Sequence, residues 1–363
     1  MEDIVLDSPV DREVVVGGKR YVYFGGNNYL GLANHGAVLG AARQSLLAHG
    51  LSAAASRETS GTSRAHVELE EALAAFCRRP AAAIFSSGYL AVAAMVAALR
   101  ARADVLLVDE RTHVSGRDAA TLAGLDVVLF AHLSPEALAR AAAALGSRRA
   151  LVLTDGLFPQ DGAIAPLDRY LEALGAREAI LLVDDAHGLG VLGASGRGTA
   201  EHRGVEDDPR VFTVATLSKA LGSFGGCAPC DPALRERIRA TAAYAGATPI
   251  PPPAAAGAAA AVRLLAGDHS ILARLRENVA RVKAGLREAG VEAPDSPAPI
   301  VQIAWPEREK LERAHARLRE RGLLVPLVRY PGGPPQGALR LTISAAHTAE
   351  DAGRLVSAWR SLA

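Results

Sequence analysis

Short runs of β-branched and aliphatic residues recur through the middle of the 363-residue chain, with helical stretches between them. Continuous apolar runs of this length are typical of strands that helices cover on both faces. Strands that alternate with helices form a mostly parallel sheet, so we expect an α/β fold. The predicted strands are 81–85, 105–108, 127–130, 150–154, 179–183 and 211–216.

The two ends of the chain differ from this middle part. Two short runs, 13–16 and 20–24, flank Gly17-Gly18 and predict a hairpin. From about Asp268 the sequence changes to Arg/Glu-rich helices, with predicted strands at 299–304, 323–328 and 338–343 and a last helix from Thr348. We therefore expect a short N-terminal segment (1–25), a large α/β domain (26–267) and a smaller C-terminal α+β domain (268–363).

Composition excludes several classes of protein. Half of the residues are apolar and the formal net charge is +1, which argues against disorder and against nucleic-acid binding. The longest apolar runs are too short for a membrane span and the first residues have no signal-peptide pattern, so we expect a cytoplasmic protein.

Two cysteines, Cys227 and Cys230, have CxxC spacing. We expect two free thiols on a loop, and a redox or metal role is the alternative.

Ligands of parallel sheets collect at the carboxyl ends of the strands. Those ends carry His113, Asp155, Asp184 with His187, and Lys219. A carboxylate that closes a buried strand is costly unless a positive group meets it, and a histidine three residues later can address the same ligand. An Asp-Asp turn with a capping histidine, or a metal site that also uses Asp185, remains an open alternative.

Lys219 is one of four lysines and ends a β-branched run in a glycine-rich turn. Partial desolvation lowers the pKa of an amine and frees its lone pair for imine formation. Lys19, Lys283 and Lys310 lie among polar residues, and we expect them to be solvated. The same pattern occurs at ordinary strand ends, so Lys219 alone does not establish catalysis.

Three further segments have a structural and a functional interpretation. Ser86-Ser-Gly-Tyr89 joins a strand to an apolar helix, which either simply starts that helix or forms a phosphate cradle. Asn27 and Asn28 lie in a turn-rich loop that either caps a domain or presents an amide to a ligand. Arg340 alternates with aliphatic residues on a strand, where it is either a surface residue or a carboxylate clamp.

Together these segments resemble the α-oxoamine synthases, a family of pyridoxal phosphate (PLP) enzymes, in order along nearly the whole chain. The resemblance implies PLP fold type I, as in aspartate aminotransferase, and a homodimer with active sites at its interface. The matching segments are Asn27-Asn-Tyr-Leu-Gly-Leu, Phe85-Ser-Ser-Gly-Tyr, Asp109-Glu with His113, Val183-Asp-Asp-Ala-His-Gly-Leu-Gly, Thr216-Leu-Ser-Lys-Ala-Leu-Gly, Thr248 with Pro251-Pro, and Leu339-Arg-Leu-Thr with Ala-Ala-His347-Thr.

The resemblance also implies a role for each residue. Lys219 would form the Schiff base with PLP and later remove the Cα proton of the substrate. His113 would stack on the pyridine ring, Asp184 would pair with the ring nitrogen, and His187 would bond the phenolic oxygen. The phosphate would be held by Ser87, Gly88 and Tyr89 N–H groups, by Thr216, and by Thr248 of the other subunit. The substrate carboxylate would be bound by Arg340 with Asn27 or Asn28.

The family reaction condenses a small amino acid, such as glycine, alanine or serine, with an acyl-CoA, usually with loss of CO2, to give an α-amino ketone. An aminotransferase or aldol-type lyase on the same scaffold, or a non-catalytic partner subunit, are the alternatives. The chain departs from the family pattern at Asp155, usually Glu, at Pro159, usually Ser, and at the two cysteines. It also begins close to the Asn27 loop, so we expect the family's N-terminal arm to be short or missing.

Overall fold

The computed structural model describes residues 4–330 and 333–361. The chain divides into two compact units. The sheet unit consists of Gly36–Phe158 and Ile164–Gly267, and the C-terminal unit consists of Met1–His35, Pro159–Ala163 and Asp268–Ala363. Residues 26–35 and 159–163 thus belong to the C-terminal unit, whereas the sequence assigned them to the large domain. The division into three parts with these bounds remains a prediction, and residues 1–3, 331–332 and 362–363 lie outside the described residues.

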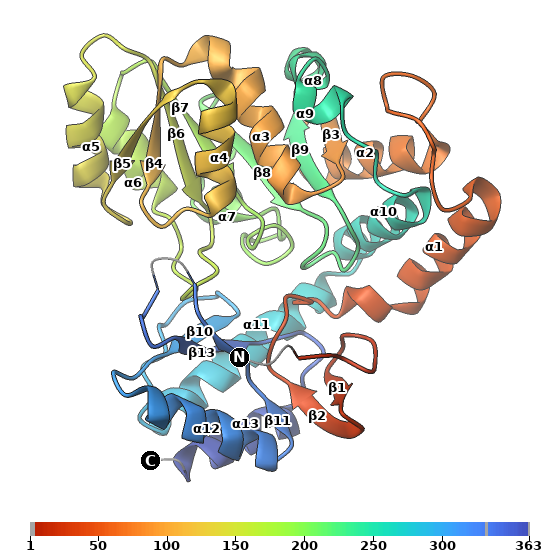
Figure 1. Cartoon of the computed structure of the whole chain (residues 1–363), viewed down its shortest axis with the longest axis vertical. Coiled ribbons are helices and arrows are strands. Elements are labelled where there is room, and N and C mark those ends of the chain that lie inside the picture. Colours follow the sequence, from red (N-terminus) through yellow and green to blue (C-terminus); the bar gives the residue numbers. More distant parts are fainter. Residues whose placement is uncertain (1–3, 331–332, 362–363) are drawn as a thin grey trace. The chain divides into compact units, whose positions relative to one another are not determined.

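A mixed sheet of seven strands forms the centre of the sheet unit, in the order β3-β9-β8-β7-β6-β4-β5 (Figure 1). Neighbouring strands from β8 to β5 are parallel, and β9 runs antiparallel to both of its neighbours. The α/β fold with a mostly parallel sheet is confirmed. The strands are β3 (Ala81–Phe85), β4 (Val105–Asp109), β5 (Asp126–Phe130), β6 (Ala150–Asp155), β7 (Ala179–Asp184), β8 (Val211–Thr216) and β9 (Gly226–Cys230).

Helices cover this sheet, and their composition follows their burial. Helix α3 is apolar on all sides because it is buried almost throughout, in contact with β8, β9 and α4. The helices of this unit are α1 (Gly36–His49), α2 (Arg64–Phe76), α3 (Gly88–Leu99), α4 (Val114–Ala123), α5 (Pro135–Ala144), α6 (Leu167–Leu174), α7 (Thr199–His202), α8 (Pro232–Arg239), α9 (Ala242–Ala245) and α10 (Pro252–Gly267), with a 3-10 turn at Arg100–Arg102.

The two cysteines of the CxxC pattern lie in a buried strand, so the prediction of a loop was wrong. Cys227 and Cys230 belong to β9 and are both free and buried. Side chains three apart on a strand point to opposite faces of the sheet, which separates the two thiols. Pro229 pairs in register with Ala82 of β3, while the pairing with β8 ends at Cys227. Proline therefore lies where only one neighbouring strand is paired, a position that tolerates its missing N–H.

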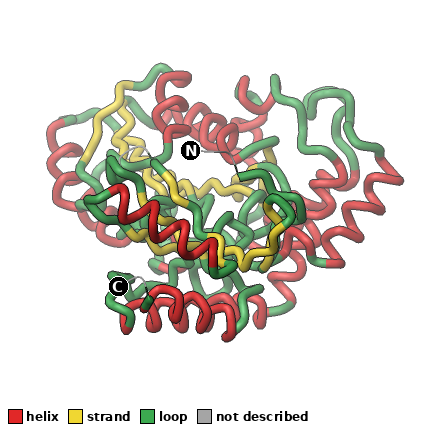
Figure 2. Tube along the Cα trace, turned by 60° about the horizontal axis from the view of Figure 1, so that its bottom comes forward, coloured by secondary structure: helices red, strands yellow, loops and turns green. Residues whose placement is uncertain are grey.

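The C-terminal unit contains two sheets of three strands, β1-β2-β11 and β10-β13-β12, and Figure 2 shows the helices and strands from a second direction. Its strands are β1 (Glu13–Val16), β2 (Lys19–Tyr23), β10 (Ile300–Ile303), β11 (Leu323–Leu324), β12 (Leu327–Val328) and β13 (Ala338–Thr342). Its helices are α11 (His269–Glu288), α12 (Arg308–Glu320) and α13 (Ala349–Arg360), with a 3-10 turn at Leu32–Asn34.

Two predictions for this unit were wrong. The single strand expected at 323–328 is divided into β11 and β12, which pair in different sheets, because Pro326 interrupts the run. Lys283, expected to be solvated, is only 2% exposed on α11. Its ammonium donates hydrogen bonds to the carbonyl (2.9 Å) and the hydroxyl (3.0 Å) of Ser296. Burial lowers the pKa of Lys283 to about 8.

Within residues 4–330 and 333–361, no helix has both the length and the apolar character that crossing a membrane requires.

The position of β9 predicts unreactive thiols. Burial raises the pKa of Cys230 to about 12 and that of Cys227 well above its ordinary value. The third cysteine, the half-buried Cys77, also has its pKa raised to about 12 by burial. Only the thiolate reacts, so at pH 8 each thiol should react with a thiol dye about a thousandfold more slowly than a free cysteine. Stopped-flow labelling of the native protein, with the protein in denaturant as control, measures this. Rapid labelling of two native thiols would contradict the strand assignment.

Candidate active site

Four neighbouring parallel strands of the sheet unit place polar residues at one edge of the sheet. Strands β4, β6 and β7 end at Asp109, Asp155 and Asp184, and β8 ends at Thr216. The register sets Asp155 directly opposite Asp184 on adjacent strands. Parallel strands share the edge at which their carboxyl ends lie, so the sequence positions these groups together through strand length alone.

Lys219 and His187 meet at this edge. The Lys219 Nζ lies 2.7 Å from the Nε2 of His187, which is buried. Lys219 follows β8 in a tight turn closed by the N–H of Gly222, which donates to the Lys219 carbonyl at 2.9 Å. His187 lies in the turn 186–190, which follows the end of β7 at Asp184. The structure therefore brings together the residues that the sequence predicted from two separate strand ends.

Asp184 is half-buried at the end of β7 and has positive charge nearby. Burial raises its pKa, while the Lys219 ammonium, the Ala186 N–H at 3.1 Å and His113 act in the opposite direction. Burial and the neighbouring Asp184 raise the pKa of Asp155 well above its ordinary value. Two adjacent carboxyl groups with little access to water ionise together only at a cost in free energy. Asp155, the more deeply buried of the two, accepts the His113 backbone N–H at 3.1 Å.

Asp185 fixes the loop that carries His187, a role that the sequence analysis did not identify. Its buried carboxylate accepts hydrogen bonds from the Thr199 N–H (2.7 Å) and hydroxyl (2.6 Å), and burial raises its pKa to about 6. A Cβ at Gly156, Gly188 or Gly198 would lie 2.4, 1.9 or 1.8 Å from its oxygens. In the sequence, the glycines that surround Asp185 were the feature from which this role could have been predicted. The part of the chain that the structure describes contains no cluster of three or more His, Cys, Asp or Glu suited to a metal.

The start of helix α3 provides backbone N–H groups for an anion. The first N–H groups of a helix, here those of Gly88 and Tyr89, have no acceptor within the helix, and the helix dipole favours negative charge there. The Ser87 hydroxyl accepts the Leu90 N–H at 3.2 Å and so caps the helix. A Cβ at Gly88 would lie 3.1 Å from the Thr216 side chain, which shows how closely this helix start approaches β8.

The remaining predicted residues of the sheet unit are at its surface. His113 is exposed at the N-terminus of α4, where its Nδ1 is 2.8 Å from the Ser115 hydroxyl. The exposed Tyr89 donates a short hydrogen bond to Asp118. Thr248 is exposed in the segment between α9 and α10.

Arg340 lies in the C-terminal unit, on β13, and is only 5% exposed. Its guanidinium donates to the Pro159 carbonyl (2.7 Å), the Thr342 hydroxyl (3.1 Å) and the Asn27 side-chain oxygen (3.2 Å). All three acceptors are neutral. A buried cation is stable only when an anion or several hydrogen bonds compensate its lost hydration. Arg340 is therefore suited to bind a carboxylate.

The two asparagines of the N-terminal loop have different tasks. The Asn27 oxygen accepts from Arg340 and, at 3.2 Å, from the Tyr29 hydroxyl. The Asn28 amide donates to the Val10 carbonyl at 3.1 Å, and its oxygen accepts the Ala33 N–H at 3.2 Å. Asn28 thus stabilises the loop, and Asn27 is the residue that meets Arg340.

The donor set of the sheet unit fits PLP. The cofactor needs an amine for its aldehyde, an anion for its ring nitrogen, a donor for its phenolic oxygen and N–H groups for its phosphate. These groups would be provided by Lys219, Asp184, His187 and the start of α3, respectively. The metal alternative needs three ligands that the described residues do not assemble.

The chain is similar to known PLP-dependent enzymes in sequence and in structure. Residues 19–358 match the aminotransferase class I and II family. The 8-amino-7-oxononanoate synthase of Thioalkalivibrio sulfidiphilus is 40% identical over 98% of this chain and 91% of its own. The serine palmitoyltransferase of Sphingomonas wittichii superposes with a TM-score of 0.94 at 30% identity, over 99% of this chain and 91% of that one. That of S. paucimobilis, solved with a bound PLP–myriocin aldimine, gives 0.93 at 28% identity, over 99% and 92%. The chain therefore belongs to the class I and II aminotransferase family and, within it, to the PLP-dependent α-oxoamine synthases.

Proposed function

We propose that this enzyme joins the α-carbon of a small amino acid to the acyl group of an acyl-CoA thioester, releasing CoA and CO2 and forming an α-amino ketone. The observation that carries the proposal is the 2.7 Å contact between Lys219 Nζ and His187 Nε2 at the strand end that bears Asp184. One amine, one imidazole and one carboxyl group at a single sheet edge are the groups that this reaction needs.

Each residue has a task that follows from its surroundings. Bound PLP supplies the electron sink that takes up the electron pair released at the amino-acid α-carbon. Asp184, as an anion, would keep the ring nitrogen protonated. Lys219 would take the proton from the α-carbon, and His187 would hold the lysine amine in place through the contact at 2.7 Å. Ser87, Gly88, Tyr89 and Thr216 would bind the phosphate.

Arg340 would bind the carboxylate of the amino acid, assisted by Asn27. A bidentate guanidinium fixes both the position and the plane of a carboxylate. That orientation determines which bond of the α-carbon is broken first, and so favours proton removal over early loss of CO2. Burial of Arg340 among neutral acceptors supports the proposal, because its charge gains most from an anion.

The acyl donor and the amino acid are chosen by analogy. Curated relatives at 40% identity are named 8-amino-7-oxononanoate synthases, and the solved neighbours are serine palmitoyltransferases. We take an 8-amino-7-oxononanoate synthase-like activity as the first hypothesis. The test is a CoA-release assay with glycine, alanine and serine, each combined with acyl-CoAs of increasing length. Release of CoA with product ketone supports the proposal; amino-group transfer to a keto acid without CoA release would replace it with aminotransferase activity.

We also propose a homodimer in the cytoplasm, where amino acids and acyl-CoA are available. Helix α1 packs against α10 on one side, while Leu39, Leu46 and Leu47 recur at i, i+7 and i+8 on the other. These three leucines are 51%, 44% and 80% exposed, and Leu51 beyond the helix is 72% exposed. An exposed apolar patch of this kind marks an interface. In the dimer, the exposed Thr248 would reach the phosphate of the partner's cofactor.

Replacing Lys219 tests the catalytic amine. Lys219→Ala should abolish turnover and the visible absorption of the lysine-bound cofactor, because no other amine takes its place at this edge. The matched control is Lys283→Met, which removes the other buried amine and should keep both signals. Turnover by Lys219→Ala at the wild-type rate would remove the basis of the proposal.

Replacing Arg340 tests the carboxylate site. A charge-assisted hydrogen-bond pair is worth about 1.5–3 kcal/mol, so Arg340→Ala should raise the KM of the amino acid by about 10- to 100-fold. The KM of the acyl-CoA and the absorption of the bound cofactor should stay the same. Steady-state kinetics with each substrate varied in turn measures both constants. An effect on the acyl-CoA constant alone would show that Arg340 serves the other substrate.

Charging the α1 patch tests the dimer. Leu47→Glu with Leu51→Glu should give a monomer in sedimentation experiments, because two carboxylates cannot be buried unpaired in an apolar contact. The monomer should also bind PLP more weakly, since it lacks the partner's threonine. Arg313→Glu, a charge change at an exposed residue of α12, is the control and should remain dimeric. A wild-type protein that sediments as a monomer would exclude the dimer.

A further inference from the structure

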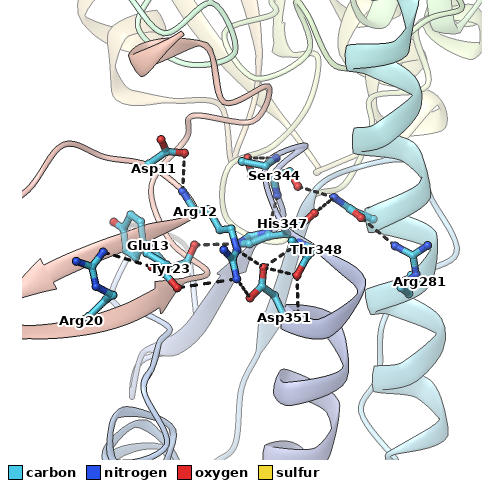
Figure 3. A network of polar contacts seen from close by, with 12 residues as sticks. Asp11, Arg12, Glu13, Arg20, Tyr23, Arg281, Ser344, His347, Thr348 and Asp351 are labelled. Atoms are coloured by element: carbon cyan, nitrogen blue, oxygen red, sulfur yellow. Dashed lines mark hydrogen bonds and ion pairs between the residues drawn. The ribbon is translucent and has the colours of Figure 1, made fainter. Parts of the chain in front are cut away.

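The substrate carboxylate site depends on how the loop around Asn27 is held. Figure 3 shows a polar network in which Arg12 and Tyr23 of the N-terminal segment meet His347 and Asp351 near the start of α13. We infer that His347 is a positioning residue: its imidazole holds the Asn27 loop against Arg340, so amino-acid binding depends on a side chain that does not touch the substrate. The inference rests on the proposed carboxylate role of Arg340 and adds a residue to that site.

His347 has a defined place and a defined tautomer. Its Nδ1 accepts the Ser344 N–H at 3.0 Å, so its Nε2 carries the proton and donates to the Tyr23 carbonyl at 3.1 Å. The ring is 5% exposed and stacks on Phe24, with centroids 4.2 Å apart and planes 22° apart. Nε2 and one face of the ring therefore join two segments more than 300 positions apart in the sequence, while Nδ1 bonds within its own segment.

The segment 342–347 holds the Asn27 loop on both sides. His347 fixes the loop before Asn27, and further hydrogen bonds fix it before and after that residue. These contacts are Thr342 N–H to Phe24 O (2.9 Å), Ser344 hydroxyl to Asn28 O (3.1 Å), and Ala345 N–H to Tyr29 O (2.8 Å).

Strand β13 also carries Arg340, so one short stretch of chain sets both partners of the Arg340–Asn27 hydrogen bond.

A second set of contacts supports this stretch without the imidazole. The Asn278 amide donates to the carbonyls of Ser344 (3.0 Å) and His347 (2.7 Å). At the start of α13, Asp351 accepts from the Arg12 guanidinium at 2.6 and 2.9 Å and from the Thr348 N–H at 2.8 Å (Figure 3). These contacts hold the backbone of the stretch without the ring, so the hydrogen bond to the Asn27 loop that depends on the imidazole is the one to the Tyr23 carbonyl.

The test compares two replacements of His347. Leucine removes both hydrogen bonds, whereas glutamine keeps a donor that reaches the Tyr23 carbonyl. In the holoenzyme, His347→Leu should raise the dissociation constant of the amino acid about tenfold, the equivalent of one hydrogen bond, and His347→Gln should restore most of the affinity. The constant is measured from the change in cofactor absorption on titration with amino acid. Binding of the corresponding amine, which lacks the carboxylate, should not change.

Three controls separate positioning from general damage. The cofactor absorption without substrate, the KM of acyl-CoA and the thermal midpoint should match those of Lys283→Met, a buried polar replacement in the same unit. Adding His347→Leu to Arg340→Ala should cause no further loss of amino-acid affinity, because both act on one site. If His347→Leu does not fold, Ser344→Ala, which removes the bond to Asn28, should give the same selective loss.

The outcomes distinguish the inference from the proposed function. Wild-type protein that binds the amino acid no better than the carboxylate-free amine would refute the proposed carboxylate site itself. Wild-type protein that discriminates between them, combined with unchanged amino-acid affinity in His347→Leu or Ser344→Ala, would overturn the role of His347 alone. Additive losses in the double variant would also overturn it.

Discussion

The proposed chemistry depends on one carboxyl group, that of the half-buried Asp184, which lies at a strand end close to the amine of Lys219. Burial alone would favour the neutral acid, and the nearby ammonium and the Ala186 N–H act against that effect. A carboxyl group balanced in this way can become the anion that a protonated ring nitrogen requires. The parallel sheet makes the balance possible, because β7 and β8 end side by side and their following turns return His187 and Lys219 to the same edge.

The two carboxyl groups near Asp184, those of Asp155 and Asp185, have different environments. Asp155, directly opposite Asp184, is buried, and burial together with the Asp184 charge raises its pKa well above the ordinary value, which opposes two adjacent negative charges. Asp185 points to the Thr199 backbone and to closely packed glycines, and it keeps the His187 loop in one conformation. The shorter side chain of Asp155, where the family usually has Glu, remains long enough to accept the His113 N–H.

Sequence reasoning succeeded where a function depends on the position of strand ends. The alternation of apolar runs with helices predicted the sheet, and the residues after each run predicted Asp184, His187 and Lys219 as one cluster. Sequence reasoning failed where the surrounding structure, and not the local sequence pattern, determines the secondary structure or the burial of a residue. Gly226–Cys230 contains glycine and proline and looks like a loop, yet it pairs between β3 and β8. Lys283 is surrounded by charged residues in the sequence, but the helix turns its side chain inward onto Ser296. The strands that pair with a segment, and the helix face that turns toward the core, both depend on residues far away in the sequence.

Pro159, where the resemblance led us to expect a serine, contacts Arg340 through its backbone. From the sequence, a proline in place of serine removes a hydroxyl, and with it a contact to cofactor or substrate. In the structure the residue contributes its carbonyl, which accepts the Arg340 Nε at 2.7 Å, and a carbonyl is available whatever side chain the residue carries. Proline also restricts its own backbone angle, which lowers the entropy lost when the acceptor is held in place. The substitution therefore removes a side-chain donor and rigidifies a backbone acceptor of Arg340, the residue proposed to bind the carboxylate.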